Sequence, residues 1–205
     1  FPFKDTEITA LIGDQRSSLI GHWGKEFYGN SKCTFGTGAF FLRSLKDELL
    51  ATRQSGCLLT MIAFDHFAEE YPIVCAGSLI EWLKNSLKLF ECREELNSIN
   101  LNSSKSPSDS VYFNPSLSGS LFPYWDPSLR GSFNNISLQN DKIDFILAVF
   151  ESIAYSVKLI VSNLSIKVLS VDGGMCGNLG FCKLLADICN CDISKHIYFF
   201  IYEFN

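Results

Sequence analysis

Two glycine-rich stretches of this sequence have residue types and spacing that could bind phosphate. The GTG stretch at residues 36–38 separates two runs of β-forming residues, and the DGG stretch at residues 172–174 separates an apolar run from a helical pattern. Glycine lets backbone N–H groups approach an anion closely, and the Thr37 hydroxyl would be a further donor. Taken alone, each stretch is also typical of a plain turn. Asn178 follows the second stretch and could offer its amide to a nucleotide base or ribose.

Asp14 is the acidic residue whose position suggests chemistry. It lies between a predicted strand over residues 7–13 and a predicted helix over residues 15–27. A carboxylate there could cap the helix by accepting hydrogen bonds from its first amides. It could instead serve as a general base or a metal ligand, because ligands of α/β folds bind beyond the carboxyl ends of strands. The pattern leaves both roles open.

Other reactive residue types are less informative. The loop over residues 122–131 (FPYWDPSLRG) holds prolines and large aromatic residues, so we interpret it as a rigid structural loop pinned by an Asp126–Arg130 pair. The three histidines have no recognisable Ser or Cys partner, which disfavours a nucleophilic triad. The eight cysteines contain no C-x-x-C pair, which disfavours a zinc site and favours buried, reduced thiols.

Length and composition narrow the class of protein. The chain has 205 residues, of which 47% are hydrophobic and 19% charged, as is typical of one globular domain with a large core. The net charge of −5 and the lack of a dense basic run disfavour nucleic-acid binding. The sequence has no run of about 18 apolar residues, so no transmembrane helix is predicted. Phe1 opens the chain without a leader pattern, so we expect a segment of a longer protein.

Strands and helices alternate along the chain, which predicts an α/β fold that could place these residues at strand ends. Residues 36–38 would turn a hairpin, and Asp141 would cap the longest helix. Residues 97–110 are rich in Ser and Asn and are predicted to form a solvated loop. The predicted strands cover residues 32–35, 39–42, 57–63 (as a buried strand), 71–74, 111–113 and 168–171. The other predicted helices cover residues 77–90, 141–161 and 179–189.

Six blocks of sequence, in the same order, resemble the C-terminal domain of the FGGY carbohydrate kinases. They are GDQRSSL (13–19), FGTGAF (35–40), AGSLIEWL (76–83), VYFNPSLSG…PYWDPSLRG (111–131), ESIAY (151–155) and VDGGMCGN (171–178). Within that family they look nearer to the glycerol kinases than to the pentulose kinases. The resemblance spans about residues 5–192. It implies an actin-like, ribonuclease-H-like ATPase domain over residues 1–192, with a mixed sheet flanked by helices. It also implies that this domain is incomplete, that the N-terminal kinase domain is absent and that residues 193–205 form a divergent tail.

The same resemblance implies roles for individual residues. Asp14 would be the catalytic base, would bind the substrate and would be the candidate ligand of Mg²⁺. Gln15 would hydrogen-bond the polyol, and Phe40 would form an aromatic wall against its carbon atoms. The residues that would bind ATP are Gly36, Thr37, Gly38, Gly77, Ile80, Glu81, Gly174, Met175 and Asn178.

The implied activity is transfer of a phosphoryl group from ATP to glycerol, giving sn-glycerol 3-phosphate, in a cytoplasmic enzyme that uses Mg²⁺. Because the N-terminal domain would supply half of the site, the 205-residue chain alone is expected not to turn over glycerol. Two alternatives stay open: a kinase for another sugar or polyol, and a degenerate paralogue that only binds nucleotide or protein. Assembly into a homo-oligomer and association with mitochondria also stay open. Glu81 and Asn135 depart from the family, which commonly has Gln and Gly at these positions.

Overall fold

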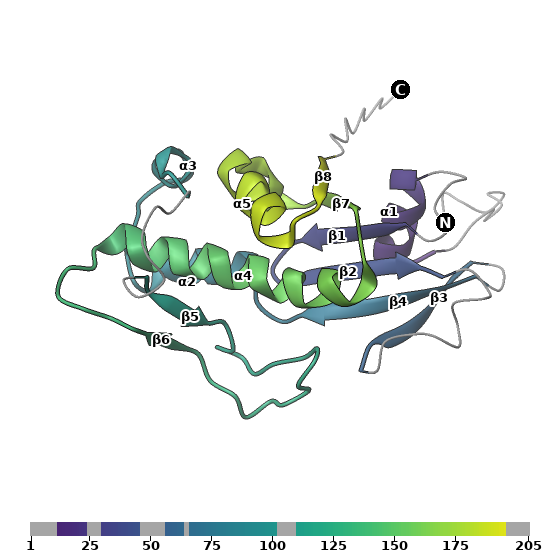
Figure 1. Ribbon diagram of the computed structural model, residues 1–205, viewed down its shortest axis with the longest axis horizontal. Coiled ribbons are helices and arrows are strands. Elements are labelled where there is room, and N and C mark those ends of the chain that lie inside the picture. Colours follow the sequence, from purple (N-terminus) through teal and green to yellow (C-terminus); the bar gives the residue numbers. More distant parts are fainter. Residues whose placement is uncertain (1–11, 24–29, 46–55, 64–65, 102–109, 196–205) are drawn as a thin grey trace, which may run out of the picture.

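A six-stranded mixed sheet forms the centre of the protein (Figure 1). The computed structural model describes residues 12–23, 30–45, 56–63, 66–101 and 110–195. In spatial order the strands are β3 (Leu58–Ala63), β4 (His66–Ile73), β2 (Ala39–Ser44), β1 (Ser31–Phe35), β7 (Val168–Asp172) and β8 (Asp192–Lys195). The pairs β3–β4, β4–β2 and β2–β1 are antiparallel, whereas β7 is parallel to both β1 and β8. The predicted hairpin around residues 36–38 is confirmed.

Five helices and a small second sheet surround this sheet within the described residues. The helices are α1 (Asp14–Trp23), α2 (Gly77–Asn85), α3 (Arg93–Ser98), α4 (Lys142–Leu164) and α5 (Leu179–Cys189). A short 3₁₀ turn, η4 (Gly174–Gly177), follows β7, and β5 (Tyr112–Asn114) pairs with β6 (Ser132–Asn134). The bounds of α5 agree with the prediction for residues 179–189. Residues 7–11 of the first predicted strand, 24–27 of the first predicted helix and 196–205 of the tail lie outside the described residues.

The two faces of the sheet carry two separate hydrophobic cores. Successive side chains of a strand point to opposite faces. Accordingly, Ala39 and Phe41 of β2 belong to the larger core, which includes buried residues of α4 and α5. Leu42 belongs to a smaller core with Leu19 of α1. The sheet therefore lies between α1 on one side and α4 with α5 on the other.

The α4 helix is the central helix of the larger core and begins with a capping box. The Asp141 carboxylate accepts hydrogen bonds from the N–H groups of Ile143 (2.8 Å) and Asp144 (3.3 Å). The Asp144 carboxylate accepts one from the N–H of Asp141 (3.1 Å). These bonds satisfy amides that the first turn of a helix leaves free. The helix ends where Ser165 adopts a left-handed conformation (φ 52°). The prediction of a helix over residues 141–161 capped by Asp141 is confirmed.

By length and composition alone, α4 could cross a lipid bilayer, since it has 23 predominantly apolar residues. It is the one helix among the described residues of which this is true. The core helix of a globular domain passes the same test, and 56% of the most apolar stretch of α4 is buried inside the protein. Residues at helical spacing, such as Val149, Ile153 and Val157, pack in the larger core. Packing therefore accounts for the apolar character of α4.

Two predicted elements differ from the structure at the periphery. The predicted buried strand over residues 57–63 is β3, but Leu58 (46% exposed) and Met61 (55% exposed) face solvent because β3 is an edge strand. An apolar run alone does not distinguish an edge strand from a central one. The helix predicted over residues 77–90 ends at Asn85, and the chain then turns through Lys88 at a φ of 56°.

The loop over residues 122–131 is ordered as predicted, but its pinning contacts are different. The Asp126 carboxylate accepts hydrogen bonds from the N–H (2.8 Å) and hydroxyl (2.6 Å) of Ser128. The Arg130 guanidinium donates to backbone carbonyls of the same loop instead of to Asp126. The predicted Asp126–Arg130 pair is therefore wrong. The Trp125 indole N–H donates to the carbonyl of Gly56 (2.8 Å), which fastens the loop to the residues before β3.

Replacing the cap residue of α4 is expected to destabilise the whole domain, because α4 is the central core helix. We expect Asp141→Ala to lower the free energy of unfolding by about 1 kcal/mol, since two amides lose their acceptor. Asp141→Asn, which keeps an oxygen acceptor, should stay close to the wild type. Urea denaturation followed by circular dichroism measures both. Equal stability of the alanine and asparagine variants would contradict this role of the cap.

Candidate functional site

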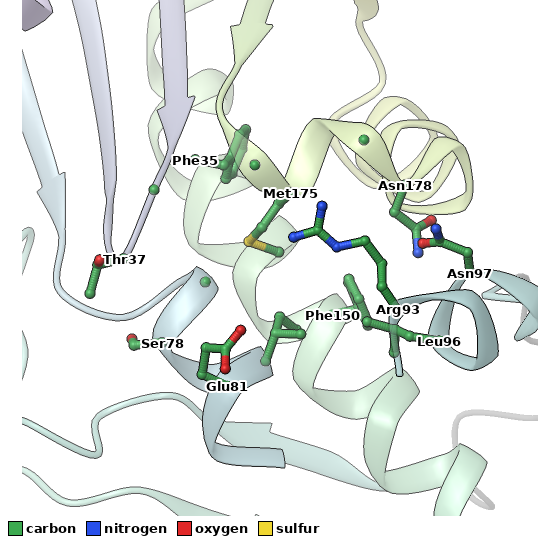
Figure 2. Close-up of a pocket in the computed structure, with 15 residues that line it drawn as sticks. Phe35, Thr37, Ser78, Glu81, Arg93, Leu96, Asn97, Phe150, Met175 and Asn178 are labelled. Atoms are coloured by element: carbon green, nitrogen blue, oxygen red, sulfur yellow. The ribbon is translucent and has the colours of Figure 1, made fainter. Parts of the chain in front are cut away.

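A cavity of about 510 Å³ opens between the β1–β2 turn, the start of α2, the helix α3 and the η4 turn (Figure 2). Eight of the nine residues predicted to bind ATP line it. These are Gly36, Thr37, Gly77, Ile80, Glu81, Gly174, Met175 and Asn178. The two glycine-rich stretches, which are about 135 residues apart in sequence, thus meet because β1 and β7 are adjacent parallel strands. The ninth predicted residue, Gly38, is not among the lining residues.

The β1–β2 turn and the start of α2 are joined by backbone contact. The N–H of Gly77 donates to the carbonyl of Gly36 (2.9 Å), and the N–H groups of Ala76 (3.0 Å) and Ser78 (2.9 Å) donate to the carbonyl of Thr37. A Cβ on Gly77 would lie 2.5 Å from the Gly36 oxygen. Glycine is therefore required at position 77, because any side chain would push the turn away from the helix.

The glycines after β7 have two different roles. Gly173 has a φ of +94°, and a Cβ there would lie 2.3 Å from the carbonyl oxygen of Phe35, so this glycine packs η4 against β1. Gly174 and Gly177 line the cavity, and a Cβ on either would meet nothing within 4 Å. The absence of side chains at these two positions is not needed for packing and leaves open space in the wall of the cavity.

Two polar side chains of the cavity wall have buried atoms without a hydrogen-bond partner among the described residues. Asn178 caps α5, because its Oδ1 accepts a hydrogen bond from the N–H of Phe181 (3.0 Å). That bond identifies the oxygen, so the unpartnered atom is the Nδ2 donor. The Ser78 hydroxyl is likewise buried and unpartnered. Buried polar atoms are rarely left unsatisfied, so both atoms are candidate contacts for a ligand.

Opposite charges also line the cavity. The Glu81 carboxylate is held by the Asn85 side-chain amide (2.9 Å) one turn further along α2. Figure 2 shows the Arg93 guanidinium reaching from α3 into the cavity toward Met175. Sequence reasoning missed Arg93, because residues 91–96 were given no predicted element, and it missed Asn97, because residues 97–110 were interpreted as a solvated loop. Two acidic residues after Arg93 were the available signal of a helix start.

A buried charge cluster under the cavity was also missed. The Oδ2 atom of Asp172 accepts hydrogen bonds from the Ser18 hydroxyl (2.9 Å) and from Nε2 of His22 (3.2 Å), and it forms an ion pair with Nζ of Lys32 (3.1 Å). The His22 and Lys32 side chains are fully buried. Burial by itself raises the pKa of Asp172, but the hydrogen bond from His22 and the charge of Lys32 outweigh it and hold this pKa below its usual range. The cluster ties α1 to the strand that leads into η4.

The three residues predicted to contact the polyol do not line the cavity. Asp14 is the first residue of α1, and its exposed carboxylate accepts a hydrogen bond from the N–H of Gln15 (2.8 Å). The Oε1 atom of Gln15 is buried and has no partner among the described residues. Phe40 is half-buried against the smaller core, on the α1 side of the sheet. The structure therefore separates the predicted polyol residues from the cavity, and the Asp172 cluster connects α1, which carries Asp14 and Gln15, to the strand that leads into η4.

Comparison with known proteins finds relatives among kinases. Residues 31–197 match the family described as "FGGY family of carbohydrate kinases, C-terminal domain". A glycerol kinase of Streptococcus pyogenes serotype M28 is 35% identical over 202 residues, which cover 93% of this chain and 39% of the relative. The chain thus spans about 39% of the length of the curated relatives it matches.

Solved structures show the same relationship. The crystal structure of Plasmodium falciparum glycerol kinase with ADP matches with a TM-score of 0.79 at 30% identity and covers 93% of this chain and 39% of that one. A xylulose kinase from Lactobacillus acidophilus matches with a TM-score of 0.69 at 18% identity, covering 88% of this chain and 37% of that one. The second likeness concerns the fold alone. Both agree with the predicted mixed sheet flanked by helices.

The lowered pKa of Asp172 predicts that its contribution to the stability of the folded domain is lost at acidic pH. A carboxyl group with a lowered pKa stabilises the folded state above its unfolded-state pKa of about 3.9, and this contribution is lost as the pH falls through and below that value. We expect Asp172→Asn to lower the free energy of unfolding by about 3 kcal/mol at pH 7, because the buried ammonium group of Lys32 loses its counter-charge.

The difference in stability between Asp172→Asn and the wild type should therefore narrow as the pH is lowered from about 5 to about 3. Urea denaturation at a series of pH values measures it. Asp187→Asn, which changes an exposed residue of α5, is the matched control and should follow the wild type throughout. A difference that stays constant over this pH range would contradict the assignment.

Proposed function

This chain belongs to the FGGY family of carbohydrate kinases, and from that premise we propose that its cavity is the nucleotide site of a kinase that transfers a phosphoryl group from ATP to glycerol. The family match is to the C-terminal domain and covers residues 31–197. The predicted membership in this family is confirmed, as is the relationship to glycerol kinases. The activity, the substrate and the nucleotide of the whole protein are our proposal, because the chain spans about 39% of its relatives.

One observation supports the proposal most strongly. The same cavity contains both open space and hydrogen-bond donors that have no partner in the described part of the chain. Gly174 and Gly177 leave room in the wall, and the Nδ2 donor of Asn178 and the hydroxyl of Ser78 lack partners there among the described residues. A volume of about 510 Å³ lies within the range of small-molecule and cofactor sites. The relative from Plasmodium falciparum, whose structure was solved with ADP, supports a nucleotide as the occupant.

The proposed chemistry needs positioning more than covalent catalysis. Phosphoryl transfer proceeds through a loose transition state, so the protein mainly orients the attacking hydroxyl and stabilises charge. Asp14 would accept the proton of the hydroxyl, Gln15 would orient the polyol through its unpartnered oxygen, and Phe40 would contact its carbons. The Asp172 cluster would hold α1, and therefore Asp14, relative to the η4 edge of the cavity.

The donor set is compatible with Mg²⁺ as a partner of the nucleotide. Mg²⁺ binds one or two carboxylates and takes its other ligands from phosphate oxygens and water, and it neutralises phosphate charge when bound. Asp14 has an exposed carboxylate that could be one such ligand. The described residues contain no group of three or more His, Cys, Asp or Glu that could hold a metal by themselves. A Mg²⁺ ion would therefore depend on the nucleotide for its remaining ligands.

We also propose a cytoplasmic location. All eight cysteines lie among the described residues, and all are free thiols, as is usual in a reducing compartment. Neither the described residues nor the relatives support association with mitochondria. Nothing among the described residues supports assembly into a homo-oligomer.

The proposal predicts a specific loss of nucleotide affinity on changing Asn178. Asn178→Asp keeps the oxygen that caps α5 but removes the Nδ2 donor, so we expect ADP binding to weaken about tenfold while the stability of the domain is retained. Thr37→Val, which removes one hydroxyl from the turn, should also weaken binding. Isothermal titration calorimetry with Mg-ADP measures the affinity, with Ser137→Ala, which lies outside the cavity, as the control.

The two outcomes of this titration separate the proposed function from its alternative. Affinity that falls in the Asn178 and Thr37 variants but not in the Ser137 variant supports the nucleotide site. No measurable ADP or ATP affinity in the wild type, or affinity that both variants retain in full, would favour a module that binds another partner.

Replacing Glu81 is expected to strengthen ADP binding, in contrast to the variants of Asn178 and Thr37. Its carboxylate lies in the same cavity as the proposed phosphates and adds negative charge there. We expect Glu81→Gln to tighten Mg-free ADP binding about threefold at low ionic strength and by less at high ionic strength, because the repulsion is screened. Glu94→Gln, which removes an equal charge from α3 outside the cavity, should have little effect. Weaker binding by Glu81→Gln would contradict a repulsive role.

A further inference from the structure

Two thiols lie close together behind the wall of the cavity, at the junction of η4 and α5. The Sγ atom of Cys176 donates a hydrogen bond to the carbonyl of Asp172 (3.2 Å), and Sγ of Cys182 donates to the carbonyl of Cys176 (3.7 Å). The Cys182 thiol therefore lies against the residue that carries the other thiol. Cys176 lies between Met175 and Gly177, which both line the cavity. The proposed function gives neither thiol a role.

The two thiols differ in reactivity. The neighbouring Cys176 thiol, helped by the charge of Lys195, outweighs burial and lowers the pKa of Cys182 to about 7. The interaction with Cys182, together with burial, raises the pKa of Cys176 well above its usual range. Cys182 is half-buried, whereas Cys176 is only 2% exposed. The accessible thiol is thus also the one that carries thiolate at neutral pH, and the thiolate is the nucleophilic form.

The other cysteines do not combine these properties at the cavity. Burial raises the pKa of Cys33 far above its usual range, so this thiol stays protonated. Cys189 and Cys191 form a second pair of interacting thiols, but they lie at the end of α5 that is distant from η4. Cys92 is exposed and lies beside α3. Only the pair of Cys182 and Cys176 combines a reactive thiol, a neighbouring thiol and a position directly beside lining residues of the cavity.

We propose that Cys182 and Cys176 are a reversible oxidation site that forms a disulfide with a hydroperoxide as the oxidant. The Cys182 thiolate attacks one oxygen of the hydroperoxide, the O–O bond breaks, and the other oxygen takes up a proton and leaves as water or an alcohol. Cys182 is then a sulfenic acid. The sulfur of Cys176 attacks the sulfur of Cys182, the S–O bond breaks, and the hydroxide leaves as water with the proton of Cys176. The two sulfurs lose two electrons, which reduce the peroxide.

Disulfide formation would change the shape of the cavity. The two sulfurs must approach to about 2.05 Å. Cys176 then gives up its hydrogen bond to the carbonyl of Asp172, and the η4 turn shifts toward α5. Met175, Gly177 and the Asn178 amide belong to that turn or follow it, so their positions in the wall change. The effect on nucleotide affinity rests on the proposed function, whereas the disulfide itself does not.

The chemical part of the proposal is tested on the 205-residue chain with hydrogen peroxide. Intact mass spectrometry should show loss of two hydrogens, peptide mapping should place the bond between Cys176 and Cys182, and dithiothreitol should reverse it. Cys182→Ser should abolish the bond. Cys176→Ser should leave a sulfenic acid on Cys182 that dimedone traps, and Cys92→Ser, the control, should behave as the wild type. A bond between other cysteines, or no loss of hydrogen, would overturn the proposal.

The effect on the cavity is tested by titrating Mg-ADP into reduced and oxidised protein. We expect oxidation to weaken binding about tenfold in the wild type and in Cys92→Ser, and to have no effect in Cys182→Ser. By linkage, saturating Mg-ADP should shift the thiol–disulfide equilibrium toward the reduced form by the same factor. Equal affinity of the reduced and oxidised forms would overturn the coupling and leave the nucleotide site standing. A mapped disulfide in a chain that binds no nucleotide would instead overturn the proposed function together with the coupling.

Discussion

The Oδ2 atom of Asp172 is the point on which the arrangement of the site depends. Ser18 and His22 reach it from α1 and Lys32 reaches it from β1, while the backbone of Asp172 continues into Gly173 and η4. A buried carboxylate is unfavourable unless donors surround it. The position of Asp172 at the end of β7 is therefore favourable only when α1 and β1 supply these donors. One oxygen atom joins the helix that begins at Asp14 to the turn that lines the cavity.

The elements that were predicted well from the sequence are those with strong local signals. The hairpin at residues 36–38, the capped helix α4 and the helix α5 each carry a turn, a cap or a periodic apolar face within a few residues. The errors arise where the deciding contact is distant. The apolar run of β3 looks buried, but its neighbours in the sheet decide that it is an edge.

The same distinction applies to the candidate site. The residues that were correctly placed in the cavity lie in or near short motifs in which a turn or a helix cap favours glycine or asparagine. Arg93 carries no such mark, because α3 is short and contributes one long side chain across the cavity. The hydrogen bonds of Ser18 and His22 to Asp172 span 154 and 150 residues of sequence. Parallel pairing of β1 with β7 creates this cluster, and no local pattern contains that pairing.

The hydrogen bonds between the β1–β2 turn and the start of α2 have a mechanical consequence. Three amides at the head of α2 are already bonded to the carbonyls of Gly36 and Thr37. An anion that enters the cavity therefore meets a helix end whose first donors are occupied, and it gains more from the amides of the turn itself. These bonds make the turn and the start of α2 one hydrogen-bonded unit. We therefore expect a ligand that displaces Thr37 to displace Glu81, which lies one helical turn further along α2 and lines the same cavity.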